Sequence, residues 1–383
     1  MKRNYIARRF QSSGAGLSLD TEALAKYKDI IDLSIGDTDF TTDESIINAA
    51  FRDARAGHTH YGDPKGDPEL IDAVCRAWEE DFGQRLPRDH VLVSASSCLG
   101  MALVMLAILD PGDEVIVFSP YFPMYREQIE LAGGVCVDVP TYASEDYAID
   151  EARLRAAITP RTKAIVFNNP TNPTGMGYDG KTLELLARVA QEHDLLIAAD
   201  EIYTTYLYEG DFRPIRTLPG MAERTITLNS FSKNFLMTGW RVGVIIAEPE
   251  LLAVMNRING SLIYSAPSVS QRAAIQALAM RKEIREKYVT AYRDRIFYSA
   301  DRIEKLPYLS LVRPKGTFYL FPGVEKTGLD EKAFCKVLLD QAHVLVSPGT
   351  PFGVSAAGHF RIACTVGIDR LKAAFDRMEK LSF

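Results

Sequence analysis

Short β-branched and apolar runs alternate with helix-length segments across the middle of the chain, and this alternation constrains the fold more than any other feature. Runs at residues 91–94, 114–118, 164–167 and 195–199 are each followed by a segment with helical spacing of apolar residues. Strands that alternate with helices in this way form a mostly parallel sheet with right-handed crossovers. We therefore expect an α/β fold, in which ligands bind at the carboxyl edge of the strands.

The pattern changes after residue 248, where long helical segments begin. Residues 268–306 exceed the usual length of one helix, so we expect a break there or a helix that links two bodies. Beyond it, runs at 309–312, 316–321, 344–347 and 359–364, with a helical segment at 331–341, predict a small mixed sheet flanked by helices. A second, smaller domain is therefore expected at the carboxyl end.

Composition excludes several classes of protein. The 383 residues carry a net charge of −6, which gives no reason to expect nucleic-acid binding. No apolar run reaches the roughly 18 residues that a membrane helix needs. The cysteines are scattered without a CxxC spacing and the histidines show no ligand spacing, so we predict no disulfide framework, no metal site and a cytoplasmic protein. The basic first 19 residues favour an arm on the folded body, with an organelle presequence as the alternative.

One lysine stands out as a chemical group. Lys233 follows an apolar run at 225–228, comes directly after two hydroxyl residues, Ser230 and Ser232, and lies shortly before Arg241. Desolvation and a nearby cation disfavour the ammonium form, which makes the amine a better nucleophile for a carbonyl. Hydroxyls and a guanidinium also suit a phosphate. An aldehyde that carries a phosphate meets both demands, and pyridoxal 5′-phosphate is the obvious candidate. A solvated loop lysine beside a surface arginine is the alternative.

A second candidate phosphate site lies where a small-residue turn, 95–98, enters an apolar helix at 99–109. The free backbone amides of a helix start bind phosphate when no bulky side chain blocks the approach. Ser97 and Cys98 occupy this position. Close helix packing by small residues is the alternative explanation.

Several motifs occur together in one order and spacing. They are Asn-Pro-Thr-Asn-Pro-Thr-Gly at 169–175, Asp-Glu-Ile-Tyr at 200–203, Ser-Phe-Ser-Lys at 230–233, Gly-Trp-Arg at 239–241 and Phe-Arg-Ile at 360–362. With them the chain resembles the class I/II aminotransferases among the fold type I pyridoxal phosphate enzymes, over nearly its whole length. The resemblance implies a large cofactor-binding domain at residues 46–280 with a mostly parallel seven-stranded sheet between helices. It also implies a smaller α+β domain at 281–383, to which the N-terminal segment, 1–45, belongs.

The resemblance also implies roles around the cofactor ring. Lys233 would hold the cofactor as a Schiff base and move a proton during transamination, and Asp200 would pair with the ring nitrogen. Tyr203 and Asn172 would hydrogen-bond the phenolic oxygen, and Phe122 would stack on the ring. The prolines at 170 and 173 could carry cis peptide bonds.

Further implied contacts concern the phosphate, the substrate and a second subunit. The phosphate would be bound by Ser97, Cys98, Ser230, Ser232 and Arg241. Tyr61 would reach the phosphate of the neighbouring subunit, which makes a homodimer part of the mechanism. Arg361 would bind the α-carboxylate of the substrate, with Asn172 beside it, and Gly36 would let the backbone approach the substrate closely.

Two positions bear on the choice of substrate. Family members specific for aspartate present a second cation, but the corresponding positions here hold Ser261 and Cys98. The sequence therefore favours an aromatic or neutral amino donor, with a 2-oxo acid such as 2-oxoglutarate as the acceptor, in a ping-pong mechanism. The alternatives are a pyridoxal phosphate-dependent C–S β-lyase and a non-catalytic ligand sensor that binds the same cofactor.

Overall fold

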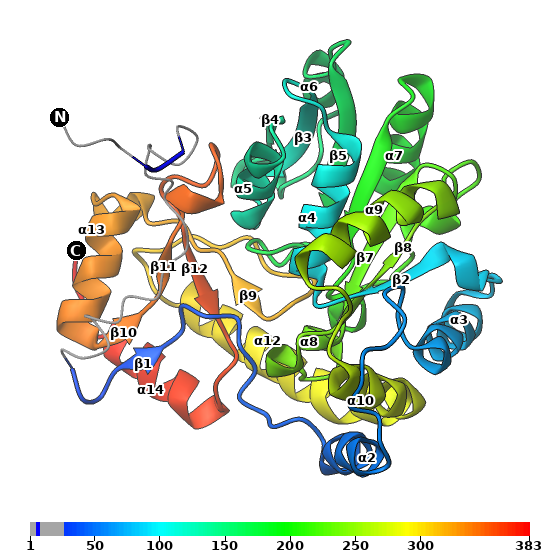
Figure 1. Ribbon diagram of the computed structural model, residues 1–383. Coiled ribbons are helices and arrows are strands. Elements are labelled where there is room, and N and C mark those ends of the chain that lie inside the picture. The colour runs from blue at the N-terminus through cyan, green and yellow to red at the C-terminus, as the bar shows by residue number, and fades with distance from the viewer. Residues whose placement is uncertain (1–4, 8–26) are drawn as a thin grey trace.

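A computed structural model describes residues 5–7 and 27–383 of the chain. The predicted basic arm falls largely on residues outside this described part. Figure 1 shows a large body built around one sheet and a second group of short strands and helices formed by the C-terminal residues together with β1 (Ile31–Asp32).

A seven-stranded, mostly parallel sheet forms the centre of the large body, as predicted. Its strand order is β2-β8-β7-β6-β5-β3-β4, and β8 alone runs in the direction opposite to the other six strands of this sheet. The strands are β2 (Val91–Ser94), β3 (Glu114–Ser119), β4 (Val135–Pro140), β5 (Thr162–Asn168), β6 (Leu196–Asp200), β7 (Thr225–Ser230) and β8 (Gly243–Ile246). β5, β6 and β7 lie side by side, so their carboxyl ends bring the polar residues that follow them to one edge.

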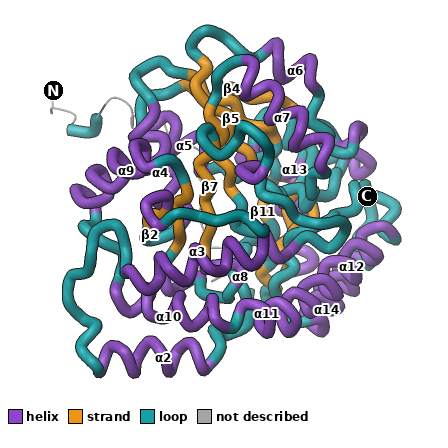
Figure 2. Tube along the Cα trace, turned by 90° about the vertical axis from the view of Figure 1, so that its right-hand side faces the viewer, coloured by secondary structure: helices purple, strands orange, loops and turns teal. Residues whose placement is uncertain are grey.

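Helices cover both faces of this sheet, because successive side chains of each strand point to opposite faces. Val115 and Val117 pack with the helices α4 (Ser97–Ile108), α5 (Met124–Leu131) and α9 (Pro249–Leu262). Ile116 and Phe118 pack on the other face with α6 (Glu151–Ala156) and α7 (Gly180–Glu192). Figure 2 shows the strands inside a shell of helices. The buried apolar runs predicted as strands are therefore buried from both sides.

The helices α2 (Glu44–Arg55), α3 (Pro68–Phe82) and α10 (Ser268–Ala279) pack together beside β2 and β8. The long helical region predicted at 268–306 is broken, as expected. After α10 come α11 (Arg281–Ile284), a π-helical stretch at Arg285–Val289, and α12 (Thr290–Glu304), which Figure 1 shows in yellow.

The C-terminal strands differ from the prediction of one small mixed sheet. β1 pairs in parallel with β10 (Val344–Leu345), while β9 (Tyr319–Leu320), β11 (Ser347–Pro348) and β12 (Phe360–Ala363) form a separate antiparallel sheet. The strand predicted at 309–312 was wrong: only Ser310 makes an isolated bridge, to Gly323. Because these strands are so short, partners distant in sequence decide where pairing begins and ends.

Two further helices, α13 (Glu331–Val337) and α14 (Ile368–Met378), complete this group. The predicted domain limits at residues 45 and 280 stay predictions. No helix within the described residues is both long enough and apolar enough to cross a membrane.

Candidate active site

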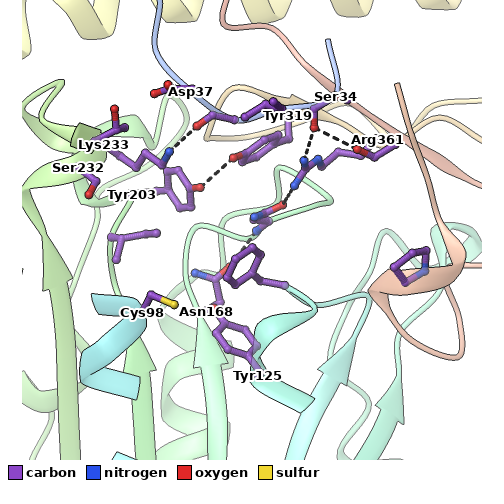
Figure 3. A pocket seen from close by; sticks show the side chains of 18 of the residues that line it. Ser34, Asp37, Cys98, Tyr125, Asn168, Tyr203, Ser232, Lys233, Tyr319 and Arg361 are labelled. Atoms are coloured by element: carbon purple, nitrogen blue, oxygen red, sulfur yellow. Dashed lines mark hydrogen bonds between the residues drawn. The ribbon is translucent and has the colours of Figure 1, made fainter. Parts of the chain in front are cut away.

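A cavity of about 1190 Å³ lies at the carboxyl edge of the large sheet, against β11 and α13. Almost every residue predicted for the site lines it. These are Gly36, Ser97, Cys98, Phe122, Asn172, Asp200, Tyr203, Ser230, Ser232, Lys233, Arg241 and Arg361. Figure 3 shows Lys233 and Arg361 at opposite sides, with Tyr203 and Tyr319 between them.

Lys233 enters the cavity from a short helix, α8 (Phe231–Asn234), that begins directly after β7. The hydroxyl of Ser230 caps this helix by accepting a 3.1 Å hydrogen bond from the Ser232 N–H. The Lys233 Nζ donates to the Gly36 carbonyl oxygen. Burial lowers the pKa of Lys233 to about 8, and the cations Arg361 and Arg241 act in the same direction, while Asp37 opposes them. The amine is therefore more easily freed of its proton than an ordinary lysine.

Position 36 requires glycine because the backbone there passes close to Tyr319. A Cβ atom at position 36 would lie 1.8 Å from the Tyr319 hydroxyl oxygen. That hydroxyl in turn lies 3.1 Å from the hydroxyl of Tyr203. The missing side chain therefore leaves room for a pair of buried tyrosines at the cavity wall.

Asp200 is the last residue of β6 and is 6% exposed. One carboxylate oxygen, Oδ2, accepts a hydrogen bond from Tyr125, while Oδ1 is buried and has no partner among the described residues. Burial raises the pKa of Asp200 to about 6, against the hydrogen bonds from Tyr125 and the Ile202 N–H, which favour the charged form. A buried carboxylate oxygen without a partner points to a donor that a ligand would bring.

The starts of two helices, α4 and α8, also border the cavity. Ser96 caps α4 by accepting a 3.1 Å hydrogen bond from the Leu99 N–H, which leaves Ser97 and Cys98 in its first turn. β8 passes so close that a Cβ at Gly243 would lie 2.8 Å from the Ser97 nitrogen. Ser230, Ser232 and Arg241 line the same cavity. Hydroxyls, helix-start amides and a guanidinium together form a site suited to a phosphate.

Arg361 is buried on β12, and its guanidinium is held by two oxygen atoms. It donates to the Ser34 carbonyl oxygen at 2.6 Å and to the Asn172 Oδ1 at 3.1 Å, and it stacks over the Tyr319 ring at 4.7 Å. Its Nε is buried without a partner in the described part of the chain. Burial also lowers the pKa of Arg361. A buried, incompletely paired guanidinium favours an anionic ligand.

The loop after β5 brings Asn172 to this position. The peptide bonds before Pro170 and Pro173 are cis, as predicted, and so is the bond before Pro120. The Asn172 N–H donates to the Asn168 side chain at 2.8 Å, and the same side chain donates to the Asp200 carbonyl oxygen at 2.9 Å. Asn168 thus connects the loop after β5 to the end of β6.

Tyr125, Tyr319, Ser34 and Asn168 also line the cavity, although sequence reasoning did not select them as site residues. Tyr125 and Tyr319 lie in segments that read as ordinary core helix and strand. Ser34 contributes a backbone oxygen, which no side-chain pattern reveals. Asn168 offered a signal, because it precedes the Asn-Pro-Thr-Asn motif.

Tyr61 is not among the described residues that line the cavity. Its side chain is 87% exposed and packs edge-on against Tyr264, with ring centroids 5.0 Å apart. Leu262 and Ile263 are exposed nearby in sequence. The single chain therefore presents Tyr61 outward on an apolar surface.

The donor set fits a cofactor with three features. The unpartnered Oδ1 of Asp200 suits a protonated ring nitrogen, the buried amine of Lys233 suits a carbonyl, and the helix starts suit a phosphate. Phe122 lines the cavity and packs edge-on to Tyr125 at 5.8 Å, which places an aromatic face near the ring site. Pyridoxal 5′-phosphate has all three features.

Comparison with known proteins gives a consistent result. Residues 28–378 match the family model for class I and II aminotransferases. The aspartate/prephenate aminotransferase of Thermus thermophilus is 37% identical, over 98% of this chain and 98% of its own length. The arginine–pyruvate transaminase AruH of Pseudomonas aeruginosa is 35% identical, over 99% and 97%. The structure of an aromatic aminotransferase from Pyrococcus horikoshii superposes with a TM-score of 0.90 at 34% identity, covering 94% of this chain and 97% of that chain.

Proposed function

Because the chain belongs to the class I and II aminotransferases, it is a pyridoxal 5′-phosphate-dependent transaminase that acts on amino and oxo acids, and we propose its substrates and residue roles. The proposed donor is a neutral or aromatic L-amino acid. The proposed acceptor is a 2-oxo acid such as 2-oxoglutarate, used in a ping-pong cycle. The observation that carries the proposal is the presence, in one cavity, of a buried lysine with a lowered pKa and a buried aspartate with a free oxygen.

When bound, the cofactor withdraws electrons from the substrate Cα through its protonated ring. Asp200 Oδ1 would accept the ring N–H and keep that proton in place. Tyr203 and Asn172 would hydrogen-bond the phenolic oxygen, and Phe122 would cover one face of the ring. The buried position of Asp200 supports this role, because an unscreened carboxylate attracts a cation strongly.

Five residues would bind the phosphate through hydroxyls, helix-start amides and one guanidinium. These are Ser97, Cys98, Ser230, Ser232 and Arg241. Arg241 donates to the Thr238 carbonyl oxygen at 2.8 Å, which holds its backbone turn and side chain together at the cavity edge. The Arg241 guanidinium and the helix-start amides would offset part of the charge of a dianionic phosphate in this place.

Lys233 would attach the cofactor covalently through Nζ and then, once displaced, move a proton to and from the substrate Cα. Its contact with the Gly36 carbonyl oxygen supports this role by holding the amine at the cavity wall. Arg361 would bind the substrate α-carboxylate in a bidentate way, since Asn172 and Ser34 already orient its guanidinium. Gly36 would allow the backbone to lie against the bound substrate.

We propose that the active enzyme is a homodimer in which Tyr61 reaches the phosphate bound by the partner subunit. The outward position of Tyr61 and the exposed Leu262 support this proposal. Tyr61→Phe should then weaken cofactor binding about 10-fold while leaving the fold intact. Unchanged affinity of Tyr61→Phe for pyridoxal 5′-phosphate would argue against this contact.

The proposed choice of donor rests on two positions that lack a cation. Cys98 stands at the start of α4 and Ser261 lies near the end of α9, and neither side chain carries a positive charge to pair with a second substrate carboxylate. The relatives named above are described as acting on aspartate or prephenate, on arginine and on aromatic substrates, so the class of relative does not by itself select the donor.

A visible spectrum of the purified holoenzyme tests the proposal. Each amino acid of a panel is added without oxo acid, and a donor should convert the visible band of the bound cofactor to the shorter-wavelength band of the aminated form and release its oxo acid. The same assay with a thioether amino acid separates the alternative: pyruvate and ammonia would indicate a C–S β-lyase. Absence of the cofactor band in the wild type, or a covalently held cofactor in Lys233→Ala, contradicts the proposed role of Lys233.

The cytoplasmic location stays a prediction. All five cysteines are unpaired in the structure, which supports a reducing compartment.

A further inference from the structure

The Tyr125 hydroxyl contacts Asp200, the residue proposed to pair with the ring nitrogen of the cofactor. Tyr125 lies in the first turn of α5, the helix that follows β3, and its side chain is 3% exposed. β5 separates β3 from β6 in the sheet, so Tyr125 crosses the end of β5 to reach Asp200 at the end of β6. The contact therefore joins α5 to β6, which is not a neighbour of β3 in the sheet.

The direction of this hydrogen bond follows from the two acidities. Burial, together with the charge of Asp200, raises the pKa of Tyr125 well above its ordinary value. The proton therefore stays on the tyrosine, and its hydroxyl donates to Asp200 Oδ2. A donor of this kind favours the charged carboxylate.

The hydrogen bond from Tyr125 also fixes the position of the other carboxylate oxygen of Asp200. A carboxylate can rotate about its bond to Cβ, but here Oδ2 is held by Tyr125, and the Asp200 backbone carbonyl accepts a bond from the Asn168 side chain at 2.9 Å. With one oxygen held by Tyr125, Oδ1 is left buried and without a partner in the described residues, on a residue that lines the cavity.

We propose that Tyr125 is a positioning residue, which holds Asp200 charged and oriented so that Oδ1 can pair with the ring nitrogen of the cofactor. This inference rests on the proposed role of Asp200. A purely structural tyrosine would serve equally well as phenylalanine, and the ring of Tyr125 does pack in the core with Met101 and Ile129. The hydroxyl is therefore the part of the side chain that the proposal concerns.

The test removes that hydroxyl in the full-length protein and measures two properties of bound pyridoxal 5′-phosphate. Tyr125→Phe should bind the cofactor about 10-fold or more weakly in a titration of the apo-protein, because a hydrogen bond to a charged group is lost. The pH midpoint of the visible band of the bound cofactor should also rise by about one unit. When Asp200 is less charged, it holds the proton on the ring nitrogen less well. The ring then loses its positive charge, and the Lys233 nitrogen that is bonded to the cofactor keeps its own proton to higher pH.

Tyr147→Phe is the matched control, because Tyr147 is also buried but its hydroxyl has no partner among the described residues. It should change neither property. The effect of Tyr125→Phe should also vanish in an Asp200→Ala background, since the tyrosine acts through the aspartate.

The outcomes are distinct. If Tyr125→Phe behaves like Tyr147→Phe while Asp200→Ala still weakens cofactor binding, the inference is overturned and the proposed function stands. If Asp200→Ala leaves cofactor affinity unchanged, the proposed role of Asp200 fails, and the inference fails with it. If Tyr125→Phe has the same effect with or without Asp200, the tyrosine does not act through it and the inference is overturned.

Discussion

Adding one methyl group at Gly36 tests the geometry of the cavity wall most directly. In Gly36→Ala the new Cβ would lie 1.8 Å from the Tyr319 hydroxyl oxygen and 2.7 Å from its Cζ. Tyr319 is buried, and its ring lies between the Arg361 guanidinium at 4.7 Å and the Tyr203 ring at 5.9 Å. The Tyr319 ring is held between these two groups, so the added methyl group forces either the loop at Gly36 or the tyrosine to shift.

Two contributions lower the free energy of unfolding of Gly36→Ala. Overpacking of a well-packed interior costs about 1–3 kcal/mol. Movement of Tyr319 also breaks its 3.1 Å hydrogen bond with Tyr203, worth about 0.5–1.5 kcal/mol. We expect Gly36→Ala to lower the free energy of unfolding by about 2–4 kcal/mol, measured by urea denaturation of the apo-protein. The KM for the amino donor should rise as well, because Tyr319 stacks against Arg361.

Two comparisons make this result decisive. Gly180→Ala is the control, since a Cβ at the first residue of α7 meets no atom within 4 Å, and alanine in a helix is stabilising by roughly 0.5–1 kcal/mol. Adding Tyr319→Phe to Gly36→Ala removes the 1.8 Å contact but leaves the 2.7 Å one, so part of the loss should be recovered. The reasoning is refuted if Gly36→Ala unfolds like Gly180→Ala with an unchanged donor KM.

Three further predictions concern charged groups of the cavity. The pKa of Asp200 is raised from 3.8 to about 6, so the folded apo-protein binds the proton of this carboxyl more tightly than the unfolded chain does. The stability that this proton contributes is full below pH 4 and is lost as the pH rises through 6. The loss amounts to about 3 kcal/mol. Asp200→Asn should abolish that part of the pH dependence in urea denaturation at pH 4 and pH 7, and an identical dependence in both proteins would contradict it. In the apo-protein, the rate at which an amine-specific reagent modifies Lys233 should rise with a midpoint near pH 8, as measured by mass spectrometry, whereas a midpoint near 10.5 would show an ordinary lysine. Arg361→Lys should raise the donor KM about 10- to 100-fold, because lysine keeps the charge but not the planar fork, while Arg313→Lys at the surface should leave the donor KM unchanged. An equal KM in both variants would exclude a bidentate carboxylate contact.

The sequence predicted the large sheet and the family because their signals are local. Apolar runs such as 164–167 are buried from both faces in the structure, so their composition alone identifies them as interior strands. The motifs that carry Asp200 and Lys233 follow strand ends directly, and parallel strands place such ends at one edge. The residues therefore meet in the cavity without any long-range information beyond the strand order.

The C-terminal strands and the positions of Tyr125, Tyr319 and Ser34 were decided by tertiary structure. β1 and β10 hold two residues each and come from opposite ends of the chain, so the pattern of neither segment reveals that they pair with each other. Tyr125 and Tyr319 read as core residues because the sequence does not show whether a buried hydroxyl has a partner. Their roles depend on which atoms come within hydrogen-bond distance after strands far apart in sequence have packed. An apolar pattern determines which residues are buried, whereas packing alone determines what each buried polar atom contacts.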